Sequence, residues 1–289
     1  MMTSQSPDSI DRPKILLTND DGIESVGLHV LARAMSRLGD VAIVAPDSEY
    51  SGAGAAIGAL HIAETIIKRH PIEGIDTSWT VSGPPGLCVF YARMGAFGFH
   101  PDIVVSGINP GANLGRSVYH SGTIGAVLTG RNGNIPGVAV SQAFAEPADD
   151  SDDARYAYEE RVSRQLWDSA AEVAIEVVAG LLDSDLDDVG VINLNVPNRP
   201  IDEIKGWRWT DVGTSPPWAM TEAKLVVHDD EAGHYKIETS WGEQLEQPPN
   251  SDAAAILDDH ISVTMMSRIT ALPVDAPAID ERLDTLLGR

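Results

Sequence analysis

Residues 15–22 read Ile-Leu-Leu-Thr-Asn-Asp-Asp-Gly, and this stretch opens the unit that decides the fold. Its apolar start shows no polar alternation, which is typical of a strand buried on both faces of a parallel sheet. Apolar residues at helical spacing follow over 25–38, with Ser25 as a candidate N-cap and Gly39 as a stop. The run Val-Ala-Ile-Val-Ala at 41–45 predicts the next strand. Together these elements predict a βαβ unit.

The same alternation continues along the first two thirds of the chain. It predicts strands at 103–106, 137–141 and 191–196, with helices at 121–130 and 161–182. This order of elements predicts an α/β fold with a doubly wound, mostly parallel sheet and right-handed crossovers.

The pattern changes after Pro197. Four of the six tryptophans lie within 207–241, among prolines and short alternating segments, which predicts a protruding β-hairpin arm. A further strand is predicted at 261–265 and a short helix at 279–287.

We therefore expect an α/β core over 14–198 and an arm with a C-terminal strand and helix over 199–289. Tryptophans on such an arm are typical of packing or of subunit interfaces. The expected assembly is a homodimer or homotetramer formed through residues 199–250.

The composition excludes several classes of function. The 289 residues carry a net charge of −23, so binding to nucleic acid or to an anionic membrane surface is disfavoured. The single cysteine, Cys88, leaves no disulfide framework and no cysteine-based zinc site. No stretch reaches the roughly 20 apolar residues that a membrane helix needs. We expect a soluble, cytoplasmic protein.

Ligands bind at the carboxyl ends of the strands in open parallel sheets, so the residues that follow each predicted strand are informative. Asp20 and Asp21 follow the first strand, Ser51 lies in the small-residue loop after the second, and Asn109 follows the strand at 103–106. Carboxylate, hydroxyl and amide oxygens form a ligand set suited to Mg²⁺, Mn²⁺ or Ca²⁺. The alternative is that Asp-Asp-Gly forms only a turn.

Ser121-Gly122-Thr123 stands at the start of a predicted helix, where free backbone amides favour a phosphate. The alternative is an ordinary serine N-cap. His120 is a further candidate, as a proton donor to a leaving group or as a structural residue. The patterns of an aspartyl-phosphate phosphatase, a nucleophile elbow and a P-loop are all absent from the sequence.

Taken together, these segments resemble the SurE family of metal-dependent survival-protein nucleotidases. The resemblance covers about residues 14–142 and continues more weakly through 193–197 to 261–264. The matching segments are 15–22, Ala45-Pro46-Asp47 with Ser51-Gly52, Ser82 to Pro85, Pro101 to Asn109, Gly111 to Gly115, and Ser121 to Ala126.

The resemblance implies a Rossmann-like core with a β-hairpin used in oligomerisation, and hydrolysis of nucleoside monophosphates. It implies one divalent cation per subunit, Mg²⁺ or Mn²⁺, with Ca²⁺ as a substitute in a crystal. The implied metal ligands are Asp20, Asp21, Ser51 and Asn109. The implied phosphate or substrate ligands are Ser121, Gly122, Thr123, Gly52 and Asn113. Asn19 and Asp20 are the implied catalytic residues, and we assign Asp20 to orienting or deprotonating the attacking water.

The sequence departs from the family pattern at three positions. Leu87 stands where the family usually has an acid, Pro84 where it has a threonine, and Thr129 where it commonly has a glutamate. The main hypothesis is a metal-dependent 5′-nucleotidase, with 3′-nucleotidase or polyphosphatase activity as variants. The alternative is a non-catalytic or degenerate nucleotide-binding protein.

Overall fold

The computed structural model describes residues 12–58, 60, 64–144, 154–184, 190–214, 220–229, 233–243, 245–267 and 276–287. Nine strands of this described part form one sheet in the order β3-β4-β2-β1-β5-β6-β7-β11-β8. In that order the strands are β3 (Ile67–Arg69), β4 (Thr77–Val81), β2 (Asp40–Pro46), β1 (Lys14–Thr18), β5 (Ile103–Pro110), β6 (Gly137–Gln142), β7 (Val191–Val196), β11 (His260–Met265) and β8 (Gly206–Trp209).

The six strands from β4 to β7 pair in parallel, and antiparallel pairing occurs between β3 and β4 and between β7 and β11. The predicted α/β class with a mostly parallel, doubly wound sheet is therefore confirmed. Strands β11 and β8 come from the region after residue 198 and extend this same sheet. The proposed boundary at 198/199 is thus not a division of the sheet.

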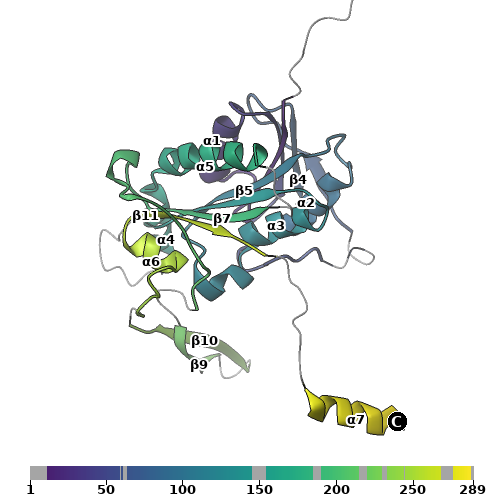
Figure 1. Cartoon of the computed structure of the whole chain (residues 1–289), viewed down its shortest axis with the longest axis vertical. Helices are drawn as coiled ribbons and strands as arrows, with labels where there is room; N and C mark the ends of the chain where they lie inside the picture. Colours follow the sequence, from purple (N-terminus) through teal and green to yellow (C-terminus); the bar gives the residue numbers. More distant parts are fainter. Residues whose placement is uncertain are drawn as a thin grey trace, which may run out of the picture.

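Helices cover both faces of the sheet (Figure 1). Helices α1 (Val26–Met35) and α5 (Trp167–Leu182) lie side by side on one face, and α2 (Pro85–Arg93) and α3 (Gly122–Arg131) pack together on the other. The remaining helices are α4 (Ala154–Ser163), α6 (Asp252–Leu257) and α7 (Pro277–Leu287), with 3₁₀ turns at Gly115–Tyr119 and Ile201–Glu203.

The two-faced burial explains the unbroken apolar run in β1. Ile15 and Leu17 belong to the apolar cluster under α1 and α5, while Leu16 belongs to the cluster under α2 and α3. All three side chains are fully buried. A strand covered on one face only would have placed a polar residue at one of these positions.

An antiparallel hairpin, β9 (Met220–Asp229) and β10 (His234–Trp241), forms a separate two-stranded sheet. Figure 1 shows it projecting from the body next to the α6 end, as expected of an arm. The same view places α7 away from the sheet. No described helix is long and apolar enough to cross a membrane.

The single helix predicted at 161–182 is wrong, because the chain breaks between α4 and α5. Side-chain amides form hydrogen bonds with the N–H and the carbonyl of Leu166, which a continuous helix would use for its own hydrogen bonds. The Leu166 amide donates to Asn198 Oδ1 at 2.8 Å, and Gln142 Nε2 donates to the Leu166 carbonyl at 3.0 Å. The sequence also did not reveal β3, β4 or α2. Helix α2 begins at Pro85, a residue whose fixed φ suits the first helical turn.

Candidate active site

Three loops meet at the carboxyl ends of β1 and β2. The Tyr50 amide donates to the Asp20 carbonyl at 2.8 Å, which joins the loop after β2 to the loop after β1. The Gly54 amide donates to the His120 carbonyl at 3.0 Å, and Thr123 Oγ1 donates to Asp20 Oδ1 at 2.6 Å. The structure therefore brings together the segments that hold the predicted residues Asp20, Ser51 and Thr123.

The beginning of α3 packs directly against Asp20. A Cβ added to Gly122 would stand 2.7 Å from Asp20 Oδ2, so only glycine fits at this position. Asp20 is 3% exposed. Because the first amides of a helix have no partner within it, the backbone N–H groups of Gly122 and Thr123 offer donors beside this carboxylate.

Ser121 is the N-cap of α3. Its Oγ accepts from the Ile124 amide at 3.1 Å, as the alternative interpretation required. This cap does not exclude a phosphate, since it satisfies the Ile124 amide while the Thr123 amide bonds to the Asp20 carboxylate, and it does not use the Gly122 amide. His120 precedes the cap and is exposed.

The two carboxylates have different surroundings. Burial raises the pKa of Asp20, and the hydrogen bond from Thr123 opposes that rise. Burial raises the pKa of Asp21 to about 8, and the negative charges of Asp20 and Glu49 raise it further. The Asp21 Oδ2 atom is buried and has no hydrogen-bond partner among the described residues. Such a pair is stable in its charged form only with a compensating positive charge.

Glu49 is a third carboxylate at the site, and the sequence analysis missed it. Its Oε1 accepts from the Ser51 Oγ at 2.5 Å and from the Ser51 amide at 2.9 Å. Its charge also raises the pKa values of Asp20 and Asp21. The available signal was an acidic residue two positions before Ser51 in a loop already placed at the sheet edge.

Asn109 lies at an irregularity in β5. The register between β5 and β6 shifts between Ser106 and Asn109, and such bulges change the direction of side chains next to a site. Asn109 Nδ2 donates to the Gly111 carbonyl at 2.7 Å. This bond uses the donor end of the amide and leaves Oδ1, the atom that a cation would bind.

Asn19 holds the shape of the loop after β1. Its Nδ2 donates to the Gly22 carbonyl at 3.0 Å and to Ser25 Oγ at 2.7 Å. Ser25 in turn caps α1 by accepting from the Leu28 amide. Asn19 therefore fixes the path of the backbone on either side of Asp20 and Asp21.

The other two predicted substrate residues lie in different settings. Gly52 is exposed with φ +84°, and a Cβ there would meet nothing within 4 Å. Asn113 is held by β7. Its amide donates to Asn195 Oδ1 at 2.7 Å, its carbonyl accepts from Asn193 Nδ2 at 2.9 Å, and its own Nδ2 donates to Ser141 Oγ at 2.8 Å.

The residues present fit a hard divalent cation. Asp20, Asp21, Ser51 and Asn109 supply only oxygen donors, and Asp21 Oδ2 is a buried oxygen with no donor. Nowhere in the described part do three or more His, Cys, Asp or Glu side chains gather to hold a metal ion. A set of two carboxylates, a hydroxyl and an amide therefore differs from a zinc or di-metal site of that kind.

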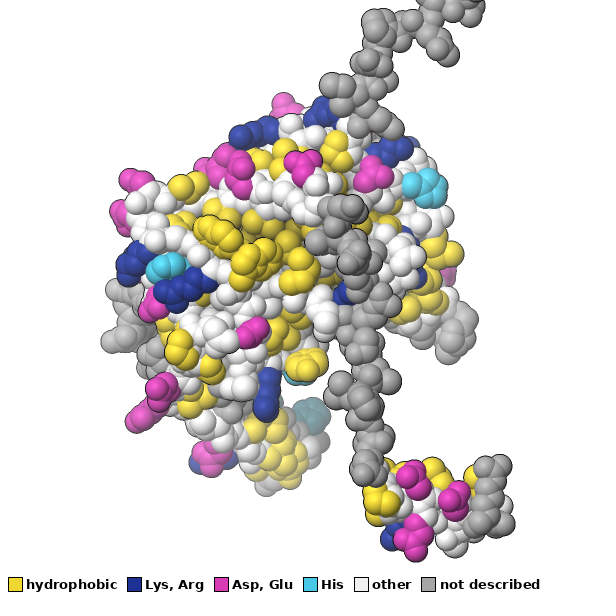
Figure 2. Space-filling view, viewed as in Figure 1, with side chains coloured by type: hydrophobic (Ala, Val, Ile, Leu, Met, Phe, Trp, Pro, Cys, Tyr) yellow, Lys and Arg dark blue, Asp and Glu magenta, His cyan; other side chains and the backbone are white. Residues whose placement is uncertain are grey.

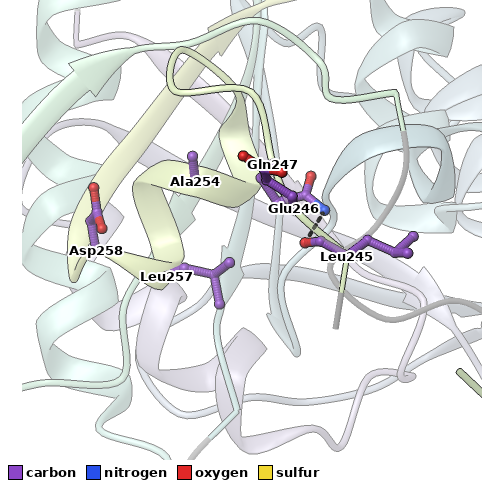
Figure 3. Close-up of a pocket in the computed structure, with 6 residues that line it drawn as sticks. All are labelled: Leu245, Glu246, Gln247, Ala254, Leu257 and Asp258. Atoms are coloured by element: carbon purple, nitrogen blue, oxygen red, sulfur yellow. Dashed lines mark hydrogen bonds between the residues drawn. The ribbon is translucent and has the colours of Figure 1, made fainter. Parts of the chain in front are cut away.

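Two surface hollows of the described part lie away from this site. One, of about 400 Å³, lies along α6 between Leu245, Gln247 and Leu257 (Figure 3). Gln247 Nε2 donates to the Leu245 carbonyl there at 3.1 Å. None of the predicted site residues lines this hollow. Its polar groups do not form the oxygen-rich arrangement found at the ends of β1, β2 and β5.

Comparison with known proteins identifies the family of the chain. The model of one protein family, described as survival protein SurE, matches residues 15–217. The chain belongs to the SurE family. The resemblance seen in the sequence is thereby confirmed.

Two bacterial SurE relatives span most of the chain. The 5′/3′-nucleotidase SurE of Erwinia tasmaniensis is 33% identical over 255 residues, which is 88% of this chain and 89% of the relative. The protein of the same name from Escherichia coli is 34% identical over 253 residues, 87% of this chain and 88% of the relative. The crystal structure of a SurE protein from Aquifex aeolicus superposes with a TM-score of 0.68 and 26% identity, covering 95% of this chain and 100% of that one.

Proposed function

We propose that this protein is a divalent-metal-dependent phosphomonoesterase that hydrolyses nucleoside monophosphates to a nucleoside and phosphate. The observation that carries the proposal is the contact of the α3 N-terminus with Asp20, next to the unpartnered buried oxygen of Asp21. A cation site and an anion site side by side suit the binding of a phosphate ester. The names of the SurE relatives support the same activity.

The chain's own residues divide into two groups in this proposal. Asp20, Asp21, Ser51 and Asn109 would hold Mg²⁺ or Mn²⁺, which supplies Lewis-acid polarisation and a water of lowered pKa. The amide of Gly122 and the hydroxyl of Ser121 bind the phosphate oxygens, and Thr123 orients Asp20 beside them through its own hydrogen bonds. The dipole of α3 stabilises the negative charge on the phosphate as the ester bond breaks.

Asp20 is the residue that we assign to orienting or deprotonating the attacking water. Asp20 is one of the proposed cation ligands and also contacts the phosphate-binding end of α3. Its Oδ1 accepts a hydrogen bond from Thr123, and its Oδ2 lies against Gly122. Asn19 has a positioning role in the proposal, since its amide ties the Asp-Asp loop to Gly22 and Ser25. Asn113 and Gly52 complete the proposed substrate contacts from the two flanking loops.

Two of the three sequence departures do not favour a non-catalytic protein. Leu87 is 4% exposed and belongs to the apolar cluster under α2 and α3. Thr129 is 5% exposed and donates to the Gly125 carbonyl of its own helix at 2.8 Å. Both positions serve packing, so their residue types are consistent with an intact catalytic site.

The test is phosphate release from a panel of 5′- and 3′-nucleoside monophosphates and short-chain polyphosphate. Each substrate is measured with EDTA, with Mg²⁺ and with Mn²⁺, for the parent and for Asp21→Ala. We expect metal-dependent release from a monophosphate that falls at least 100-fold in Asp21→Ala, a loss of roughly 2.7 kcal/mol of transition-state stabilisation.

Asp183→Ala is the matched control, because Asp183 is an exposed aspartate at the C-terminus of α5. It is expected to keep the parent rate. Release that persists in EDTA, or that is equal in Asp21→Ala and the parent, contradicts the proposal. Nucleotide binding without release under any metal supports the non-catalytic alternative instead.

We also propose that the arm joins copies of the chain into a homodimer or homotetramer. Leu225 and Val227 of β9 pair across the hairpin with Ile237 and Tyr235 of β10, and all four side chains are 55–65% exposed. Figure 2 shows apolar side chains gathered on the hairpin. An apolar face of this kind is typical of an interface. Ile237→Asp is expected to lower the mass in sedimentation equilibrium, and an unchanged mass contradicts this use of the arm.

A further inference from the structure

An aromatic side chain packs on the loop that carries Asn109. A Cβ added to Gly111 would stand 2.8 Å from ring carbon Cε2 of Phe144, so the Phe144 ring lies against the Gly111 backbone. The Gly111 carbonyl accepts the hydrogen bond from Asn109 Nδ2. Phe144, just after β6, is therefore one contact away from a proposed metal ligand.

Helix α4 places a second ring on the first. Tyr158 and Phe144 have centroids 5.9 Å apart and planes inclined by 76°, an edge-to-face contact. The Arg161 guanidinium lies 5.7 Å from the centroid of the Phe144 ring. Its Nε is buried without a hydrogen-bond partner among the described residues. Phe144, Tyr158 and Arg161 together form a corner in which two aromatic rings lie beside a positively charged side chain, in a chain with a net charge of −23.

The corner is linked to the candidate active site through the contact of Phe144 with Gly111, whose carbonyl binds Asn109. Tyr158 is 42% exposed, so its ring is accessible to a ligand. Burial raises the pKa of its hydroxyl to about 12, and the charges of Asp21, Glu49 and Asp20 add to the rise. Asp20 and Asp21 are two of the proposed cation ligands, so Tyr158 lies within electrostatic reach of the proposed cation site.

We propose that Tyr158 and Phe144 form the nucleobase-binding surface of this site, with Tyr158 providing the exposed stacking face. The inference rests on the proposed function, because it concerns the part of the same substrate that lies beyond the phosphate.

The chemistry of this corner suits a base better than a sugar or a peptide. Every nucleobase has a flat face that stacks on an aromatic ring, so such a surface binds purines and pyrimidines alike. An edge-to-face pair leaves flat ring surface uncovered for a third ring. The charged Arg161 beside Phe144 adds attraction for the electron-rich edges of a base.

The test compares adenosine 5′-monophosphate with ribose 5-phosphate, which has the same phosphate ester and no base. Tyr158→Leu is expected to raise KM for adenosine monophosphate about tenfold and to leave kcat nearly unchanged. Its KM and kcat for ribose 5-phosphate stay within about twofold of the parent. Tyr158→Phe keeps the ring and is expected to keep the parent KM for both substrates.

Phe99→Leu is the matched control. Phe99 is a half-buried aromatic residue at the amino end of the strands, beside Lys14 and Thr77. The substitution Phe99→Leu removes a ring at the opposite edge of the sheet. It is expected to change the preference between the two substrates by less than about twofold.

Three kinetic outcomes overturn the inference: an equal change for both substrates in Tyr158→Leu, no change for either, or a loss in Tyr158→Phe as large as in Tyr158→Leu. A parent protein that hydrolyses neither ester contradicts the proposed function instead. Calorimetric binding of adenosine and ribose then decides the inference. Adenosine binding weakened about tenfold by Tyr158→Leu supports it. Adenosine binding by the parent that is no stronger than ribose binding overturns it.

Discussion

Gly122 and Asp20 are in direct contact, and the contact leaves no room for a side chain at position 122. A Cβ there would lie 2.7 Å from Asp20 Oδ2 and 2.8 Å from Asp20 Cβ. The two residues are 102 positions apart in sequence, and the fold places the first turn of α3 on the carboxylate that follows β1. The distance between the proposed cation and the proposed phosphate depends on this contact.

Gly122→Ala is expected to lower kcat at least about 100-fold, because the added methyl group moves α3 or the Asp20 carboxylate away from its present position. Crowding of a buried site also costs about 1–3 kcal/mol of unfolding free energy. Steady-state kinetics and urea unfolding measure the two effects. Parent kinetics in Gly122→Ala would show that the contact has no part in catalysis.

Gly180→Ala is the control for that substitution. Gly180 is an exposed residue of α5, and a Cβ there would meet nothing within 4 Å. Alanine at such a position is expected to stabilise the helix by roughly 0.5–1 kcal/mol and to leave kcat unchanged. A glycine-to-alanine change is therefore harmful only where the chain needs the close approach.

The cation-free protein is expected to lose stability as the pH rises. Burial gives Asp21 a folded-state pKa of about 8 against an ordinary value of 3.8, so between these values the folded state binds more protons than the unfolded state. Stability then falls with increasing pH in that window and is fully present below it. Thermal unfolding in EDTA at pH 5 and pH 8 measures the slope. Adding Mn²⁺ at pH 8 should restore the melting temperature, and Asp21→Asn should remove most of the slope.

Glu49→Gln is expected to shift the acidic limb of kcat/KM to lower pH. The Glu49 charge raises the pKa values of both Asp20 and Asp21, so its removal lets both ionise at lower pH. Glutamine keeps an acceptor for Ser51 Oγ, which separates the charge from the hydrogen bond. The pH profile of Glu73→Gln, at an exposed position, should match the parent. A shift to higher pH in Glu49→Gln would contradict this sign.

The sequence predicted the centre of the fold well because its signals there are local. The apolar run at Ile15 to Thr18, the Ser25 cap and the repeated β-branched strands each follow from a few neighbouring residues, and the sheet order confirms the doubly wound class. The break before α5 was not visible, because it depends on Asn198 and Gln142, which are distant in sequence from Leu166.

The candidate site likewise contains some residues that local sequence patterns predict and others that they do not. Asp20, Asp21, Ser51 and Ser121 stand at predicted strand or helix ends, so the fold class alone places them at one edge of the sheet. Glu49 and Tyr158 carried no pattern of their own. Glu49 affects the pKa of Asp21, and Tyr158 packs on Phe144, only once the chain is folded, so neighbouring residues in the sequence do not reveal either relationship.

The asparagine pair of β7 gives the last prediction. Asn195 is fully buried, accepts from the Asn113 amide at 2.7 Å and donates to the Asn113 carbonyl at 3.2 Å. Asn195→Asp keeps the acceptor but places a carboxylate oxygen against that carbonyl. We expect a loss of about 1–3 kcal/mol in urea unfolding and a higher KM, because the loop bearing Asn113 moves. Asn195→Ala removes both hydrogen bonds to Asn113 but introduces no repulsion with its carbonyl. If repulsion causes the movement in Asn195→Asp, the loop bearing Asn113 should move less in Asn195→Ala. A KM that stays at the parent value in both variants would exclude Asn113 from the substrate site.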